Sequence, residues 1–299
     1  MANASALPGY LSLTHIHDAA NNTANNYGFI SIVSTIAWGL GYFGMPHILL
    51  RFMAIEDERK LTLSRRVASI WVVISMAVAV FIGIVGYSMT KNGALEVLEG
   101  SNSETLIIKT AQLLSQHSTI AVLLAGVILA GILASTMSTA DSQLLVCASS
   151  ASKDIFKNIL KPEAEDKKVL NVSRITVLVI AVVACIIAWN PDSSIMGLVS
   201  DAWAGLGSAF GPLVVCSLFW KRTNLPGAVA GIVSGGLFVI IWDYLPILGG
   251  QTPYTVTGIY SLLLGFFVSL LCIVIVSLLT KAPSKEIVEE FESVKTYQE

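Results

Sequence analysis

The chain has 299 residues, of which 54% are hydrophobic and only 13% are charged, and its mean hydropathy is +0.73. Soluble domains carry about 25% charged residues, so this composition excludes an ordinary soluble protein, a disordered chain and a fibrous one. The net charge of −2 gives no reason to expect a nucleic-acid partner. The composition predicts an all-α, polytopic membrane protein that contacts the lipid bilayer.

Seven stretches are apolar and long enough to cross the hydrocarbon core, which needs about 20 mostly apolar residues. They are residues 27–45, 66–88, 118–150, 172–189, 196–219, 225–243 and 255–279. The third stretch is too long for one simple span, so we expect its last turns to extend past the membrane.

The two ends of the chain are polar. Residues 1–26 contain no Lys or Arg and no apolar core of a signal peptide, so we expect an extracellular loop or N-terminal segment. His15 and His17 in this segment fit an ordinary loop better than a metal site. The tail, residues 281–299, is charged but carries a weak helical stripe, which favours a short cytoplasmic helix.

The basic residues predict the orientation of the spans. Of the 18 Lys and Arg residues, all except Lys91 and Lys109 fall in alternate loops or in the tail. Because cytoplasmic loops are enriched in Lys and Arg, this alternation fits seven crossings. It predicts a multi-pass protein of the plasma (inner) membrane with its N-terminus outside and its C-terminus in the cytoplasm.

The chain lacks the common catalytic signatures, including HExxH, GxSxG and a P-loop, and we expect no enzyme activity and no cofactor. Its four cysteines lie in or beside apolar runs and form no CxxC pair. They are expected to be small buried residues, not a disulfide or metal set: Cys147, Cys185, Cys216 and Cys272.

The first apolar stretch cannot form a regular helix throughout, because residues 38–47 contain three glycines and a proline. Irregular backbone at membrane depth occurs where it is buried in protein or lines a wet cavity, and broken helices mark binding sites in transporters. Trp38 and Tyr42 are four residues apart and would share a face, forming an aromatic wall for a small solute. The alternative is a kinked packing helix with interfacial aromatic residues.

A second polar site lies inside the third stretch. Ser135, Ser138, Thr139 and Ser142 follow i, i+3, i+4, i+7 spacing and predict one polar stripe facing the bundle interior. Hydroxyl oxygens can replace the hydration water of a hard monovalent cation. The alternative is hydrogen bonding between helices. Asp141 is either a coupling residue or a solvated residue at the cytoplasmic mouth.

Glycine pairs spaced four apart follow in the later stretches, at Gly207 and Gly211 and again at Gly227, Gly231 and Gly235. Small residues at this spacing let helices approach closely, so we interpret them as packing positions.

These residues give the chain a resemblance to the sodium:solute symporter family, over nearly everything from Tyr27 to Lys281. Three separated motifs in the family's order carry the resemblance: Trp38 through Arg51-Phe52-Met53-Ala54, Met137-Ser138-Thr139 followed by Gln143-Leu144-Leu145-Val146, and Gly197-Leu198-Val199-Ser200 through Ala202-Trp203-Ala204-Gly205 to Phe210-Gly211-Pro212.

The resemblance implies a leucine-transporter-type fold of two inverted five-helix repeats. Residues 27–219 would be the second repeat, and residues 220–280 would be two additional transmembrane helices. The implied function is symport of a small solute, most closely proline, with sodium as the coupling ion.

By the same resemblance, Trp38, Tyr42 and Pro46 would line the solute site. Ser138 and Thr139 would coordinate sodium through their hydroxyls, and Ser135 would offer its backbone carbonyl. Asp141 departs from the closest pattern in the family, which has no carboxylate at this position.

Family members carry roughly six further helices upstream, so the chain resembles only the C-terminal part of a symporter. A separate N-terminal half would then be a partner. The alternative function is that of a transport-incompetent membrane fragment or assembly partner that lacks the first repeat.

Overall fold

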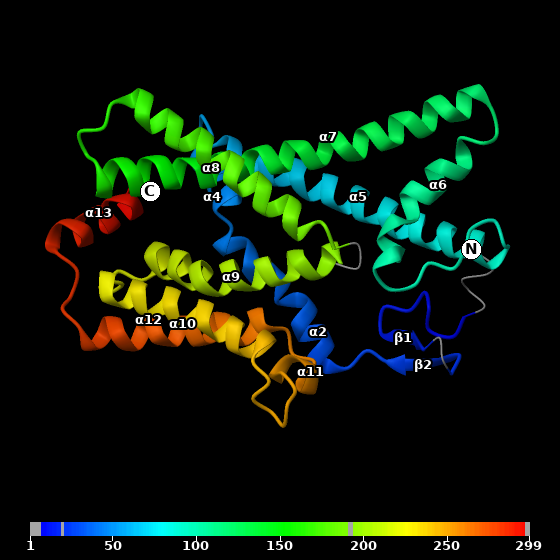
Figure 1. Ribbon diagram of the computed structural model, residues 1–299. Helices are drawn as coiled ribbons and strands as arrows, with labels where there is room; N and C mark the ends of the chain where they lie inside the picture. The colour runs from blue at the N-terminus through cyan, green and yellow to red at the C-terminus, as the bar shows by residue number, and fades with distance from the viewer. Residues whose placement is uncertain (1–6, 19–20, 191–193, 297–299) are drawn as a thin grey trace. The chain divides into compact units, whose positions relative to one another are not determined.

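The computed structural model describes residues 7–18, 21–190 and 194–296 of a mainly helical chain (Figure 1). The chain forms two compact units, Met1–Leu11 with Ala54–Ile195, and Ser12–Met53 with Met196–Glu299. Each unit is described by itself.

The first unit is built from three long helices and the shorter segments that join them. These are α5 (Lys60–Lys91), the 3-10 helix η2 (Gly100–Thr105), α6 (Leu106–Leu114), α7 (Thr119–Ser149), the π-helix η3 (Ser150–Leu160) and α8 (Asp166–Ile187). Helix α7 packs against both α6 and α8. Helix α7 begins at a capping residue, because the Ser118 hydroxyl accepts a hydrogen bond from the backbone N–H of Ala121.

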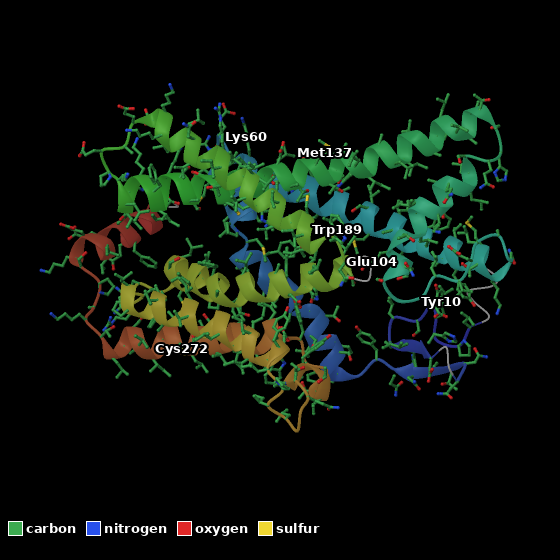
Figure 2. All side chains as sticks on the ribbon, in the orientation of Figure 1. Tyr10, Lys60, Glu104, Met137, Trp189 and Cys272 are labelled. Carbon is green, nitrogen blue, oxygen red and sulfur yellow. The ribbon has the colours of Figure 1, made fainter. Side chains whose placement is uncertain are left out.

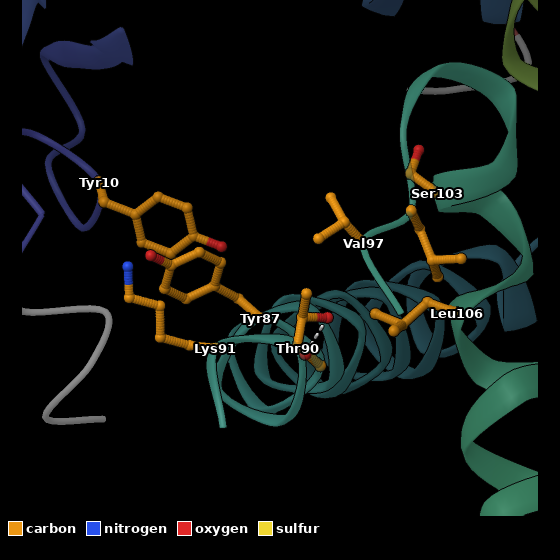
Figure 3. Close-up of a pocket in the computed structure, with 9 residues that line it drawn as sticks. Tyr10, Tyr87, Thr90, Lys91, Val97, Ser103 and Leu106 are labelled. Atoms are coloured by element: carbon orange, nitrogen blue, oxygen red, sulfur yellow. Dashed lines mark hydrogen bonds between the residues drawn. The ribbon is translucent and has the colours of Figure 1, made fainter. Parts of the chain in front are cut away.

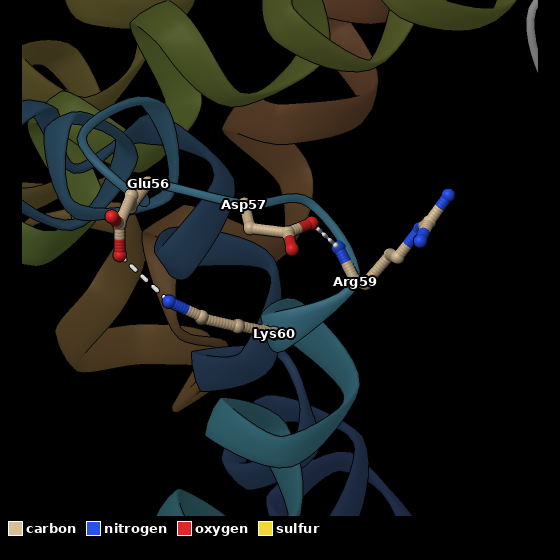
Figure 4. A network of polar contacts seen from close by, with 4 residues as sticks. All are labelled: Glu56, Asp57, Arg59 and Lys60. Carbon is tan, nitrogen blue, oxygen red and sulfur yellow. Dashed lines mark hydrogen bonds and ion pairs between the residues drawn. The ribbon is translucent and has the colours of Figure 1, made fainter.

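Polar side chains interact around the start of α5 (Figure 4). The Asp57 carboxylate accepts a hydrogen bond from the backbone N–H of Arg59 at 2.9 Å. The next residue, Lys60, pairs with Glu56 at 2.6 Å. Both members of this pair are exposed and Glu56 lies before the helix, so the pair adds only about 0–1 kcal/mol.

The second unit contains a small hairpin, a broken helix and a helical bundle. Its elements are β1 (His15–Asp18), β2 (Thr23–Asn26), α2 (Phe29–Ile36), α3 (Trp38–Gly41), the 3-10 helix η1 (Tyr42–Gly44), α4 (Pro46–Met53), α9 (Ile195–Phe219), α10 (Leu225–Tyr244), α11 (Pro253–Thr257), α12 (Ser261–Leu279) and α13 (Lys285–Thr296). The strands pair antiparallel, with His15 opposite Asn26. Residue 195, the first of α9, belongs to the first unit.

The described helices confirm the predicted membrane architecture. Six are long and apolar enough to span a membrane, and the bent pair Phe29–Gly44 and Pro46–Met53 brings the number to seven if it is one span. The most apolar stretches of α5 and α8 have no buried residues, and apolar side chains project outward along these helices (Figure 2). Such surfaces require cover by lipid or by other helices.

The structure corrects some boundaries that the sequence predicted. The stretch 255–279 is not one helix, because α11 ends at Thr257 and the next residue, Gly258, has a left-handed φ of +66° that suits glycine. The third stretch, predicted to end at residue 150 and to extend past the membrane, continues as helix to Leu160. The tail does form a helix, α13, while its cytoplasmic location and the repeat boundary at residue 219 stay predictions.

Small residues determine how closely the helices of the second unit pack. Helix α12 lies along α10 (Figure 1), and Gly227, Gly231 and Gly235 of α10 face its buried residues. Gly231 packs against Ile273, and its carbonyl accepts a hydrogen bond from the Ser269 hydroxyl at 2.9 Å. These contacts confirm the packing role predicted for the glycine pairs.

Candidate functional site

The first predicted site lies at a break in the helical path of the second unit. Helix α3 ends at Gly41, η1 ends at Gly44, and Met45 is extended (φ −89°, ψ 109°) before α4 begins at Pro46. Proline has no N–H and disfavours helical backbone at the preceding residue, so the break falls at Met45. The two halves bend by 56°, which confirms the irregular backbone predicted for residues 38–47.

The glycines of this segment allow α9 to approach its backbone. A Cβ added at Gly44 would lie 2.5 Å from the carbonyl oxygen of Leu206 and 2.7 Å from the Cα of Gly207. A Cβ at Gly41 would overlap the indole of Trp203. Gly39, Gly41 and Gly44 also have G-x-G-x-x-G spacing, but a helix precedes them, whereas the dinucleotide fingerprint follows a strand.

An aromatic cluster surrounds the break. The Trp38 ring stacks on Trp203 at 6.0 Å between centroids and on Tyr260 at 5.6 Å. Tyr42 meets Trp203 edge-on at 4.9 Å, and the Trp203 indole N–H donates a hydrogen bond of 3.0 Å to the Trp38 carbonyl. Because Trp38 is covered by two rings, Tyr42, which is 54% exposed, is the more accessible aromatic side chain.

The structure therefore brings Trp38 and Tyr42 together around a third residue, Trp203. Pro46 is half-buried at the first position of α4. Sequence reasoning did not link Trp203 to Trp38, because nothing local connects two residues that lie 165 positions apart.

The predicted ion-binding residues lie on α7, in the first unit. The Thr139 hydroxyl donates to the Ser135 carbonyl at 3.3 Å, and the Ser142 hydroxyl donates to the Thr139 carbonyl at 2.8 Å. Ser135, Ser138, Thr139 and Asp141 are exposed in the structure, and Ser142 is half-buried. An ion bound here would need further oxygen ligands. Among the described residues, no cluster of three or more His, Cys, Asp or Glu side chains could hold a metal ion. The roles of these residues stay predictions.

A polar network joins α9, α10 and the start of α12 near the break. The Tyr244 hydroxyl donates to the Asp201 carboxylate at 2.5 Å, and the Ser261 hydroxyl donates to Asp243 at 2.6 Å. The Tyr260 hydroxyl donates to the Ser200 carbonyl at 2.7 Å. The backbone N–H of Tyr260 also donates to the Ser34 hydroxyl on α2, which ties the broken helix to this network.

No sequence pattern predicted the cavity of about 580 Å³ that the first unit contains (Figure 3). Tyr10 and Tyr87 meet there at 5.1 Å between centroids, and Lys91 lies beside them. Burial and the neighbouring Tyr87 raise the pKa of Tyr10. The cavity is open and partly lined by exposed residues, so it is a weaker candidate than the break.

Broken helices within a polytopic helical protein are where many membrane transporters bind their solutes. The comparisons agree with that class. The model of the sodium:solute symporter family matches residues 9–235, and the chain belongs to this family.

Curated relatives give the same family. The sodium/proline symporter of Salmonella typhimurium is 41% identical over 88% of this chain, and the osmoregulated proline transporter of Bacillus subtilis is 40% identical over 86%. A sodium/proline symporter of Staphylococcus aureus is 38% identical over 92% of the chain. The matches cover 50%, 49% and 52% of these proteins, so the chain spans about half their length. No solved structure matches.

Proposed function

We propose that this chain supplies the second repeat and two trailing helices of a sodium-coupled symporter for proline or a similar small solute. The observation that carries the proposal is the break at Met45 with its aromatic cluster, in a chain whose relatives are named as proline transporters. The protein would lie in the plasma membrane, with residues 1–26 outside and the tail in the cytoplasm.

In this proposal the solute binds beside the broken helix. Tyr42 offers an exposed aromatic ring to the apolar part of the solute, while Trp38 supports the segment. Pro46 terminates the extended turn and begins α4. Polar backbone groups at such a break suit the charged ends of a zwitterion, as in other transporters with broken helices.

Sodium would bind at α7 through the hydroxyls of Ser138 and Thr139 and the carbonyl of Ser135. The Thr139 hydroxyl donates to that carbonyl at 3.3 Å, a bond within α7 that is compatible with both oxygens facing one ion. The remaining ligands would come from the first repeat of the fold. If sodium tightens solute binding, the solute must tighten sodium binding by the same factor.

The experiment is reconstitution of the 299-residue chain into liposomes and measurement of labelled proline uptake under an inward sodium gradient, with potassium replacing sodium as the control. A second arm adds the N-terminal half of the Salmonella typhimurium relative. Sodium-dependent uptake in the second arm supports the proposal, and uptake by the chain alone would show that it can form a complete site. No uptake in either arm, with the protein folded and inserted, would favour a transport-incompetent fragment or assembly partner.

A further inference from the structure

We infer that Trp203 is a positioning residue that fixes the shape of the broken helix and thereby sets solute affinity. The inference rests on the proposed function in its second part only, because the anchoring itself can be measured without transport.

The contacts of Trp203 converge on the residues on either side of Gly41. Its N–H donates to the Trp38 carbonyl at 3.0 Å, and its ring stacks on the Trp38 ring. The Trp203 and Tyr42 rings form a T-shaped pair with an interplanar angle of 85°. Trp203 thus holds one backbone atom and two side chains of the same short segment.

The fit at Gly41 shows that this contact is close. A Cβ at Gly41 would overlap the Nε1 and Cδ1 atoms of the Trp203 indole, so the ring passes directly over the backbone where a side chain would otherwise be. One helical turn further along α9, the backbone of Leu206 and Gly207 packs against Gly44. Helix α9 therefore contacts the segment from Trp38 to Gly44 at both of its ends.

The segment gains from such an anchor because it ends at a break. Its helical path begins at Phe29, tightens into the 3-10 helix η1 at Tyr42–Gly44, whose hydrogen-bond geometry is poorer than that of an α-helix, and stops at the extended Met45. The indole N–H of Trp203 adds a hydrogen bond to the Trp38 carbonyl from outside the segment. At membrane depth, water does not replace a hydrogen bond that is lost. Losing it should let the Tyr42 ring depart from its position.

The chain contains a matched control for this bond. Trp242 on α10 also donates its indole N–H to a backbone carbonyl, that of Ile259, at 3.1 Å, and it stacks on Phe238. Trp203→Phe and Trp242→Phe are therefore the same chemical change, a lost N–H donor with an aromatic ring retained, at two different places.

The first test measures amide hydrogen exchange by mass spectrometry on the 299-residue chain in lipid nanodiscs. For Trp203→Phe we expect exchange in residues 38–44 to become about tenfold faster, which is the effect of losing one bond to a carbonyl left without that donor. Trp242→Phe should leave these residues at the wild-type rate. Equal rates in the two variants would overturn the inference.

The second test measures proline uptake in the liposome arm that transports, normalised to the amount of inserted protein. For Trp203→Phe we expect KM for proline to rise about tenfold while the maximal rate per molecule changes less than twofold. A KM equal to that of Trp242→Phe would overturn the link to solute affinity. If the wild-type protein transports no proline, the proposed function fails, and the exchange measurement alone decides whether Trp203 anchors the break.

Discussion

The substitution Gly235→Ala tests the close packing of α9, α10 and α12 without reference to transport. A Cβ at Gly235 would overlap the carbonyl oxygen of Ser208 on α9, and it would lie 2.7 Å from the carbonyl carbon and 3.0 Å from the Cβ of Ser269 on α12. The first two atoms belong to backbone and cannot rotate away. We therefore expect the helices to separate.

The neighbouring glycine isolates the packing cost. A Cβ at Gly236 would meet nothing within 4 Å, although both glycines are in the same helix. Replacing a helical glycine by alanine stabilises a helix by about 1 kcal/mol, and this gain is common to both variants. Overpacking a tight site costs about 1–3 kcal/mol. The free energies of unfolding of Gly235→Ala and Gly236→Ala should thus differ by about 1–3 kcal/mol.

The assay is a reversible SDS titration in mixed micelles. Unfolding is followed by maleimide labelling of Cys216, which lies on α9 and is only 5% exposed, with the labelled peptide quantified by mass spectrometry. The midpoint should fall for Gly235→Ala and stay or rise for Gly236→Ala. Equal midpoints for the two variants would refute the packing argument.

Three further predictions concern other parts of the chain. Ser138→Ala or Thr139→Ala should raise the sodium concentration for half-maximal uptake severalfold without a matching loss of expression, and unchanged sodium dependence in both variants would rule out the assigned ion site. The hydrogen bond and charge of Lys109, 2.7 Å away, hold the pKa of Glu96 below its usual range. The pair therefore stabilises the folded protein fully above the unfolded pKa of about 4.3, and this stabilisation is lost as the pH falls through the lower folded pKa. Lys109→Met should raise the pKa of Glu96 in an NMR titration, and an unchanged pKa would contradict the pairing. The Glu104 carboxylate accepts hydrogen bonds from the Ser194 hydroxyl and from the backbone N–H of Ile195, where α9 begins. Glu104→Ala should therefore lower the free energy of unfolding by about 1 kcal/mol and speed proteolysis near residue 195. Unaltered cleavage would count against this capping role.

The spans were predictable because their signal is local. Apolar length alone located α5, α7, α8, α9 and α10, and the three glycines with Pro46 located the break. The boundary at Gly258 was not predictable, because a left-handed glycine between two apolar segments looks the same in the sequence as a glycine inside a helix.

The partners of the break could not be found in the same way. Trp203 and Tyr260 are separated from Trp38 by more than 160 residues, and their contacts depend on how three helices cross. Sequence periodicity specifies which face a residue occupies on its own helix, but not which helix that face meets. The resemblance predicted roles for Trp38 and Tyr42, and the structure shows that Trp203 contacts both residues.

The distribution of contacts around the broken helix also bears on how it could work. Gly41 and Gly44 face α9 at backbone contact distance, whereas Tyr42 and Phe43 between them are 54% and 45% exposed. The backbone of the segment is thus fixed by packing that tolerates no added methyl group, whereas the rings of Tyr42 and Phe43 are partly exposed and Tyr42 keeps an edge contact of 4.9 Å with Trp203. Because a ligand shifts an equilibrium only by binding its two states differently, the proposed solute would have to act on the exposed rings, while the contacts with α9 hold the backbone in place. This asymmetry explains why a substitution at Trp203 should alter solute affinity although Trp203 itself need not contact the solute.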